Sequence, residues 1–323
     1  MKVGIYGAGS IGCYVGGRLA AGGDGVAFLG RPSMATRLAD ALILTSFDGR
    51  TATVPLPHMS QDIKSLTGCD VVLVCVKSMD TAAVARTLAD VIAPDTLIVS
   101  LQNGVSNTAI LREALPGNHV LAGIVTFNVV QIGGNRFHQG TEGEIILEDA
   151  KGALQLATTL VSAGVAASVD KNIKAVLWGK LLMNLNNAVN AISGLPLKQQ
   201  LSIRKHRLVL ADCIEEGLRV LRKAGIKPAK IGKVSPGLAP TLLRLPDPVF
   251  RIVASGMLQM DDDARSSMAE DLERGREPEI EHLQGEIVRL GRQINVPTPV
   301  NVAVMAKVQE IFNSAHPANR AAR

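Results

Sequence analysis

Aromatic residues are scarce in this chain of 323 residues, where Phe, Trp and Tyr together make up 3%. The interior must therefore be built from aliphatic side chains. Proteins that bind single-stranded nucleic acid stack the bases on aromatic rings, so this scarcity argues against such a platform. The net charge is +5, but the lysines and arginines form no compact basic tract. We therefore expect no nucleic-acid partner.

Cysteine is rare as well, and the four cysteines show neither CxxC spacing nor the density of a disulfide scaffold. We expect free thiols in a reducing compartment, and no metal site. No run of 18 apolar residues occurs, and the chain begins without the long apolar core of a signal peptide. The sequence thus predicts a cytoplasmic protein that has no membrane partner.

The length of the chain and its apolar runs indicate two domains. A chain of 323 residues exceeds what one hydrophobic core usually supports. Short β-branched runs alternate with helical patterns through the first half, which predicts βαβ units and a parallel sheet. The expected strands are Val3 to Tyr6, Gly25 to Leu29, Val71 to Val76, Leu97 to Leu101 and Val120 to Val125.

The pattern changes twice further along the chain. Residues 126–148 carry turn signals and predict an antiparallel extension of the sheet. After a helix at 152–163 and a strand from Val165 to Val169, strand signals cease. We therefore predict an α/β fold, with an N-terminal Rossmann dinucleotide-binding domain at 1–170 and an all-α domain at 171–323.

The most specific motif in the first half is Gly7-Ala8-Gly9-Ser10-Ile11-Gly12, which follows a strand and opens a helix. This G-x-G-x-x-G predicts a dinucleotide site. Gly7 makes the tight turn, Gly9 lets the backbone approach a pyrophosphate, and Gly12 permits close packing of helix on strand. The amides that begin the helix would then bind the phosphates. The strand-turn-helix context makes the motif more specific than its glycine spacing alone.

Two basic residues indicate which dinucleotide binds. An NAD or FAD site of this type has an acidic residue roughly 20 residues past the glycines, where this chain has Gly30-Arg31. A carboxylate would repel a 2′-phosphate whereas a guanidinium can hold it, so Arg31 favours NADP(H). Lys77 directly follows an expected strand, at the carboxyl edge of the sheet where the cofactor should lie. It would add a second positive charge there.

A helix in the second half carries the candidate for catalysis. The segment Trp178-Gly179-Lys180-Leu181-Leu182-Met183-Asn184 places Lys180 and Asn184 at i and i+4, on one face of an otherwise apolar helix. A lysine in such surroundings is costly unless it is paired or functional, and partial burial would lower its pKa. The alternative is a lysine whose stem packs on the helix while its charge reaches water.

Together with the glycine motif and Arg31, the turn Gln102-Asn103-Gly104 and the helix from Lys180 to Asn184 resemble the ketopantoate reductase (2-dehydropantoate 2-reductase) family. The resemblance spans the chain from residue 3 to about 312, and its C-terminal motifs are the specific part. Those motifs also include Ser266-Ser267-Met268, Asp271-Leu272, Gly275-Arg276 and Glu279-Ile280.

The resemblance implies an activity and a set of roles that composition and spacing do not show. The implied activity is NADPH-dependent reduction of a small 2-oxo acid, ketopantoate, to pantoate, as in pantothenate biosynthesis. The implied roles are Lys180 as the general acid, Asn103 and Asn184 as active-site hydrogen-bonding groups with Asn103 also at the cofactor, Ser267 at the substrate carboxylate, and Glu279 at the substrate hydroxyl. Taken alone, the acidic run around Glu279 predicts only a solvated face.

One departure from the family pattern concerns the substrate. Archetypal members carry a further asparagine eight residues after the lysine, where this chain has Ala188. Another 2-oxo acid therefore stays open as the substrate. Two other interpretations also stay open: a 3-hydroxy-acid dehydrogenase of the 6-phosphogluconate dehydrogenase type, and a non-enzymatic NADP(H)-responsive binding protein. The sequence does not determine the oligomeric state, and it leaves a homodimer open.

Overall fold

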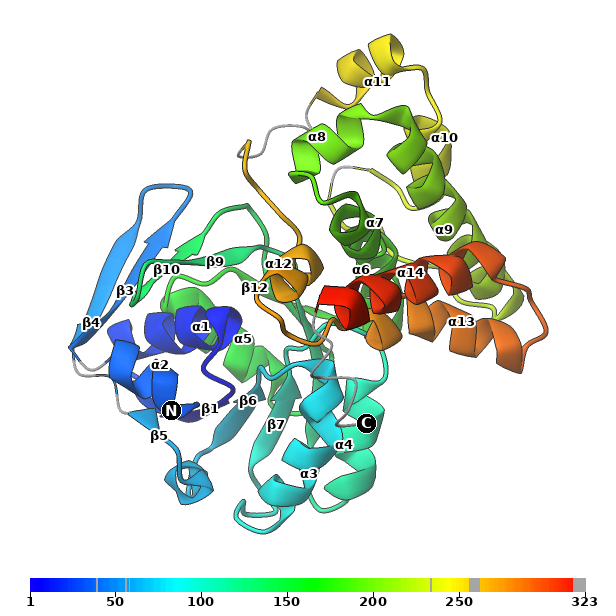
Figure 1. Cartoon of the computed structure of the whole chain (residues 1–323). Helices are drawn as coiled ribbons and strands as arrows, with labels where there is room; N and C mark the ends of the chain where they lie inside the picture. Colours follow the sequence, from blue (N-terminus) through cyan, green and yellow to red (C-terminus); the bar gives the residue numbers. More distant parts are fainter. Residues whose placement is uncertain (39, 56, 58, 233, 256–261, 316–323) are drawn as a thin grey trace. The chain divides into compact units, whose positions relative to one another are not determined.

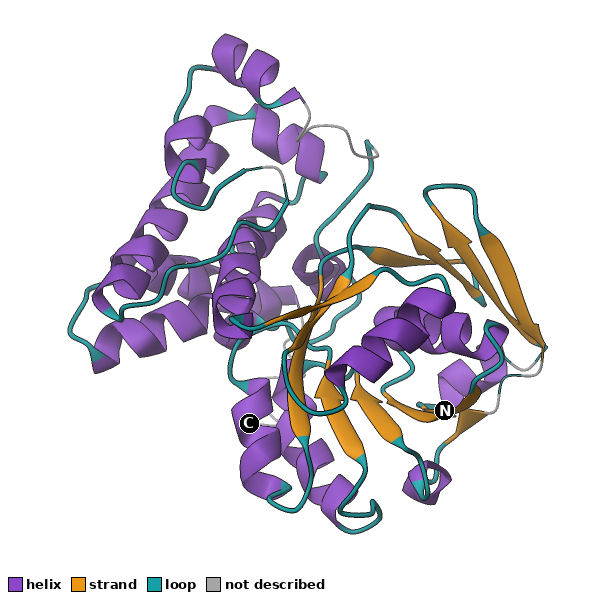
Figure 2. Cartoon of the chain, turned by 180° about the vertical axis from the view of Figure 1, so that it is seen from behind, coloured by secondary structure: helices purple, strands orange, loops and turns teal. Residues whose placement is uncertain are grey.

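The computed structural model describes residues 1–38, 40–55, 57, 59–232, 234–255 and 262–315 (Figure 1). The chain divides into two compact units, Met1–Ile173 and Lys174–Arg323. All strands among the described residues belong to the first unit, and the described part of the second consists of helices and loops (Figure 2). The predicted fold class, a Rossmann-like α/β unit followed by a helical one, is confirmed.

Eight strands among the described residues form the main sheet of the first unit. Their order is β12 (Ala167–Asp170), β11 (Ile145–Glu148), β8 (Val120–Val125), β7 (Leu97–Ser100), β6 (Val71–Val74), β1 (Lys2–Tyr6), β2 (Gly25–Leu29) and β5 (Met59–Ser60). All neighbours are parallel except β11 and β8. The order reverses between β1 and β6, and ligands of such sheets bind at the carboxyl ends of the strands beside this reversal.

A second, smaller sheet was not predicted. It contains, in order, β4 (Thr51–Pro55), β3 (Ala41–Ser46), β10 (Arg136–Gln139) and β9 (Val129–Ile132). The predicted antiparallel hairpin exists as β9 and β10, but it pairs with β3 instead of extending the main sheet. The main sheet is extended by β11. The strand β3 pairs on one side with its neighbour in sequence, β4, and on the other with β10, about ninety residues away. The local hairpin of β3 and β4 was not predicted from the sequence, and the pairing with β10 depends on tertiary structure.

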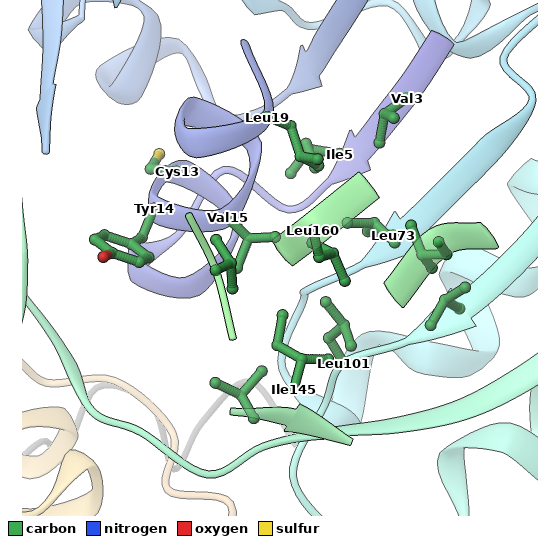
Figure 3. Packing of buried hydrophobic residues seen from close by; sticks show 14 of the residues in the cluster. Val3, Ile5, Cys13, Tyr14, Val15, Leu19, Leu73, Leu101, Ile145 and Leu160 are labelled. Atoms are coloured by element: carbon green, nitrogen blue, oxygen red, sulfur yellow. The ribbon is translucent and has the colours of Figure 1, made fainter. Parts of the chain in front are cut away.

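Apolar side chains cover both faces of the main sheet. Ile5 of β1, Val15 of α1 (Ser10–Ala21) and Leu160 of α5 (Ala153–Ser162) meet in one fully buried cluster (Figure 3). On the opposite face, Val84 of α3 (Thr81–Ala89) and Leu111 of α4 (Asn107–Ala114) belong to a second cluster. Because the sheet is buried on both sides, only its strand ends are open to a ligand.

The described part of the second unit consists of short and medium helices joined by loops. A proline or glycine stands at several of the breaks between them, as the sequence predicts. The helices are α6 (Ile173–Asn184), which begins at the boundary of the units, α7 (Asn186–Ser193), α8 (Leu197–Ser202), α9 (Arg204–Lys223), α10 (Ala239–Leu243), α11 (Asp247–Val253), α12 (Ser267–Glu273), η4 (Ile280–His282), α13 (Gln284–Gln293) and α14 (Pro299–Ala315).

Three findings bear on the expectations from composition. All four cysteines are free thiols, as predicted from their spacing. Among the helices of the described residues, none has the length and hydropathy that crossing a membrane would require. No group of three or more His, Cys, Asp or Glu side chains in the described part of the chain is arranged to hold a metal ion.

Candidate functional site

The loop between β1 and α1 has the shape that its glycines predict. Gly7 has φ +107°, in the left-handed region that favours glycine. A Cβ on Gly12 would lie 2.2 Å from the carbonyl oxygen of Gly7. The helix therefore approaches the loop so closely that only glycine fits at position 12. The amides of Gly7 and Ala8 both donate to the Leu29 carbonyl oxygen, at 3.1 and 3.2 Å. These bonds join the loop to the end of β2.

Gly9 differs from the other two glycines of the motif. Its backbone is extended, with φ −88° and ψ −166°, a conformation open to any residue. A Cβ built on Gly9 would meet no described atom within 4 Å. The folded chain itself therefore does not require glycine at this position. A ligand bound against this backbone would require glycine, and the pyrophosphate of a dinucleotide at the start of α1 is such a ligand.

Arg31 lies at the carboxyl end of β2, beside the same loop. It is exposed, and it is the N-cap residue of α2 (Pro32–Arg37). Its neighbour Gly30 packs on the loop, because a Cβ on Gly30 would come within 2.8 Å of the Ala8 Cβ. The backbone that carries Arg31 is therefore adjacent to the glycine motif.

Lys77 and Asn103 follow β6 and β7 at the same edge of the sheet. Lys77 is half-buried and is the N-cap residue of η2 (Ser78–Asp80). A Cβ on Gly7 would lie 2.7 Å from the Val76 nitrogen, so the glycine motif touches the chain just before Lys77. The Ser78 hydroxyl donates to the Asn103 carbonyl oxygen at 2.8 Å. The first unit thus brings its predicted cofactor residues to one edge.

Lys180 and Asn184 lie one turn apart on α6 of the second unit, and Asn184 is the last residue of that helix. The Lys180 side chain as a whole is half-buried. Burial of its ammonium lowers the pKa of Lys180 to about 8, and the cause is desolvation rather than a neighbouring charge. The sequence predicted this direction from the apolar neighbours. A lysine with such a pKa exchanges its proton near neutral pH.

Ser267 is exposed at the start of α12, and α7 holds it in place. The Asn187 Nδ2 atom lies 3.5 Å from the Ser267 Oγ atom. The preceding Ser266 caps α12 by accepting from the Ala269 amide at 3.2 Å, and its hydroxyl donates to the Asn187 carbonyl oxygen at 3.1 Å. The Ser266 amide donates to the Asn190 Oδ1 atom at 3.0 Å. Two turns of α7 therefore fix the first turn of α12.

Asn187 lies beside the candidate residue Ser267, and the sequence did not identify it as a candidate. Ala188, at the position of the family's further asparagine, is completely buried. Asn187 lies in the first turn of α7, three residues past the end of α6, and its amide lies beside Ser267. The only signal in the sequence was that asparagines flank position 188. The contact itself depends on the packing of α12 against α7, which no local pattern encodes.

Glu279 is half-buried and precedes η4. The acidic run that leads to it is not one solvated face, so that interpretation is wrong. Asp271 is only 4% exposed and forms an ion pair with Arg276 at 3.2 Å. Glu270, by contrast, pairs with Arg274 at 3.3 Å along the helix. Asp271 therefore anchors the end of α12 to the segment that continues to Glu279.

Comparison with known proteins gives consistent matches over the chain. Residues 3–152 match the family described as ketopantoate reductase PanE/ApbA, and residues 172–312 match its C-terminal part. The 2-dehydropantoate 2-reductase of Halobacterium salinarum is 29% identical over 308 residues, which are 93% of this chain and 95% of that protein.

Solved structures give the same result. A PanE/ApbA family ketopantoate reductase from Ralstonia eutropha is 33% identical, with a TM-score of 0.84 over 98% of this chain and 100% of that one. D-mandelate dehydrogenase, in a ternary structure with NADH and anilino(oxo)acetate, is 20% identical, with a TM-score of 0.82 over 98% of this chain and 100% of that one. At that identity the second likeness concerns the fold alone.

Proposed function

Because the chain belongs to the ketopantoate reductase family, we propose that it reduces a 2-oxo acid to the 2-hydroxy acid with NADPH. The family predicted from the motifs is confirmed. The open space against Gly9 carries the cofactor part of the proposal, because a bound ligand accounts for glycine there. Ketopantoate is the proposed substrate, since relatives named for that reaction match over nearly their full length.

The first unit holds the cofactor in this proposal. The amides of Ser10, Ile11 and Gly12 at the start of α1 bind the pyrophosphate, and Arg31 binds the 2′-phosphate. Lys77 adds positive charge beside them, and Asn103 contacts the cofactor from the next loop. When bound, the nicotinamide supplies the hydride, while the protein supplies position and charge.

The second unit supplies the groups that act on the substrate. The Lys180 ammonium stabilises the developing alkoxide and gives its proton to that oxygen. Asn184, one turn away, donates a hydrogen bond in the same region of the site. Ser267 binds the substrate carboxylate, with the Asn187 amide beside it. Glu279 accepts a hydrogen bond from the distal hydroxyl of ketopantoate.

The direct test is oxidation of NADPH in the presence of ketopantoate and of linear, branched and aromatic 2-oxo acids. We expect the highest kcat/KM with ketopantoate. A higher value with another acid would leave the reaction class intact and change the substrate, an outcome that the buried Ala188 makes worth testing. Binding of NADPH without oxidation by any acid would instead favour the non-enzymatic binding protein.

Replacing Arg31 by alanine should reduce the preference for NADPH. The guanidinium makes charge-assisted hydrogen bonds that only the 2′-phosphate offers, so kcat/KM for NADPH should fall about tenfold or more. The value for NADH should change less than about twofold, because NADH has no such phosphate. Arg37→Ala is the matched control, since Arg37 is an exposed arginine at the other end of α2. Equal efficiency with both cofactors in the intact protein would refute the assignment.

Ser267→Ala should raise the KM for the 2-oxo acid about tenfold, because one hydrogen bond to a charged carboxylate is lost. The kcat and the affinity for NADPH should stay the same, since the bond exists in ground state and transition state alike. Ser202→Ala, on α8 of the same unit, serves as the control. If KM were unchanged for every active 2-oxo acid, Ser267 would have no role in substrate binding.

A further inference from the structure

A buried cluster of polar side chains joins the loops that follow β6 and β7. Its members are between 0% and 4% exposed. Buried polar groups are costly unless they are hydrogen-bonded, and this cluster lies at the edge of the sheet where a ligand binds. The members are Ser78, Thr81, Ser100, Gln102 and Asn107.

Asn107, the first residue of α4, is at the centre of the cluster. Its Nδ2 atom donates to the Asn103 carbonyl oxygen at 2.6 Å and to the Ser78 Oγ atom at 3.1 Å. Its Oδ1 atom accepts from the Thr81 hydroxyl at 2.8 Å. A main-chain carbonyl can only accept, so the amide of Asn107 is fixed in this orientation. The Asn103 carbonyl receives a second hydrogen bond from the Ser78 hydroxyl at 2.8 Å.

The hydrogen bonds of the cluster run in one direction. The Ser100 hydroxyl donates to the Gln102 Oε1 atom at 3.0 Å, and the Gln102 Nε2 atom donates to the Thr81 hydroxyl at 2.7 Å. The Thr81 hydroxyl has a single hydrogen to donate. Two acceptors lie 2.8 Å from its oxygen, the Asn107 Oδ1 atom and the Ser78 carbonyl oxygen. Linked bonds of this kind polarise one another, so a change at one member affects the rest.

We propose that Asn107 is a positioning residue of the cofactor site. Through the Asn103 carbonyl and the Ser78 hydroxyl it sets the distance between the loop that carries Lys77 and the loop that carries Asn103. The pairing of β6 with β7 ends at Val74 and Ser100, and a further main-chain bond between the two segments runs from the Leu101 amide to the Val74 carbonyl oxygen at 2.9 Å. Beyond that bond, the side chains of Ser78 and Asn107 join the two loops. The inference rests on the proposed function, in which Lys77 and Asn103 contact the dinucleotide.

The variant Asn107→Asp tests the proposal without changing the shape of the side chain. An ionised aspartate has no hydrogen to give the Asn103 carbonyl, so near pH 8 we expect the Kd for NADP⁺ to rise about tenfold relative to the wild type. A buried carboxyl beside a carbonyl oxygen has a raised pKa. Near pH 5.5 it is protonated and donates again, so the ratio of the two Kd values should fall below about threefold. Calorimetry at both pH values measures these ratios.

Asn118→Asp is the matched control. Asn118 also donates to two main-chain carbonyls, those of Ala93 at 2.7 Å and Thr96 at 3.1 Å, but it lies near the amino ends of β7 and β8. The same substitution there should lower the melting temperature and leave the Kd for NADP⁺ within about twofold of the wild type, since no cofactor group is near. This control separates loss of stability from loss of positioning.

The possible outcomes distinguish failure of the proposed function from failure of the positioning role of Asn107. A wild type that binds neither NADP⁺ nor NADPH would overturn the proposed function and this inference with it. A wild type that binds, together with a folded Asn107→Asp that binds equally well or loses affinity equally at both pH values, overturns the inference alone. If Asn107→Asp does not fold, Ser78→Ala takes its place. That variant removes one of the two donors to the Asn103 carbonyl, and we expect about threefold weaker binding; no change would overturn the inference.

Discussion

Replacing Lys180 by methionine should remove most of the reductase activity while the protein stays folded and binds NADPH. Reduction of a ketone places negative charge on oxygen, and a fixed ammonium acts where that charge develops. Loss of such a general acid typically lowers kcat by about 10²- to 10⁴-fold. Methionine keeps the length and apolar stem of the side chain. Because burial disfavours the charge of Lys180, the variant should melt no lower than the wild type.

The pH dependence of the wild type provides an independent measurement of the same role. Burial lowers the pKa of Lys180 from 10.5 to about 8. A general acid acts in its protonated form, so kcat/KM for reduction should be constant below this pKa and fall about tenfold per pH unit above it. Oxidation of the 2-hydroxy acid needs the neutral amine as base, so its rate should rise with pH over the same range.

Lys174→Met is the control for both measurements, because Lys174 is exposed and lies on the same helix. It should leave kcat and the pH profile unchanged. A loss below about threefold in Lys180→Met, with normal circular dichroism and NADPH binding, would contradict the assignment, since general acids contribute far more. A profile that stays flat above pH 8 would contradict it as well.

Gly9→Val should abolish cofactor binding without harming the fold. The backbone of Gly9 suits any residue, and an added Cβ meets no described atom within 4 Å. The valine side chain would fill the space that the pyrophosphate needs. We expect the Kd for NADPH to rise at least about a hundredfold, equivalent to about 2.8 kcal/mol, while the melting temperature stays near that of the wild type.

Gly12→Ala, although a smaller change, should show the opposite behaviour. Its Cβ would lie 2.2 Å from the Gly7 carbonyl oxygen and 2.9 Å from the Ile5 side chain, so the backbone must move. Overpacking of this kind typically costs about 1–3 kcal/mol of stability, so the melting temperature should fall clearly. Wild-type affinity for NADPH in a folded Gly9→Val would show that no cofactor lies against this backbone, and the dinucleotide assignment would then fail.

The features that could be predicted from the sequence are those whose physical cause lies within one short segment. Gly7 and Gly12 are required by a turn and a helix contact within one strand-turn-helix unit, so the motif is visible in six residues. Lys180 stands among apolar residues of its own helix, and that pattern predicts the direction in which burial shifts its pKa. The alternation of strands and helices, and therefore the fold class, is local in the same sense.

Features that depend on segments distant in sequence required the tertiary structure. The pairing of β3 with β10 joins segments about ninety residues apart, and Asp271 is buried in a run that looks solvated. Asn187 reaches Ser267 across eighty residues because α12 packs on α7. In the sequence, Asn107 is an ordinary first residue of a helix. Only the structure shows that its side-chain amide donates to the Asn103 carbonyl oxygen and to the Ser78 Oγ atom. Packing decides the contact of Asn187 with Ser267 and that of Asn107 with Ser78, since a hydrogen bond between distant residues leaves no periodic trace in either segment.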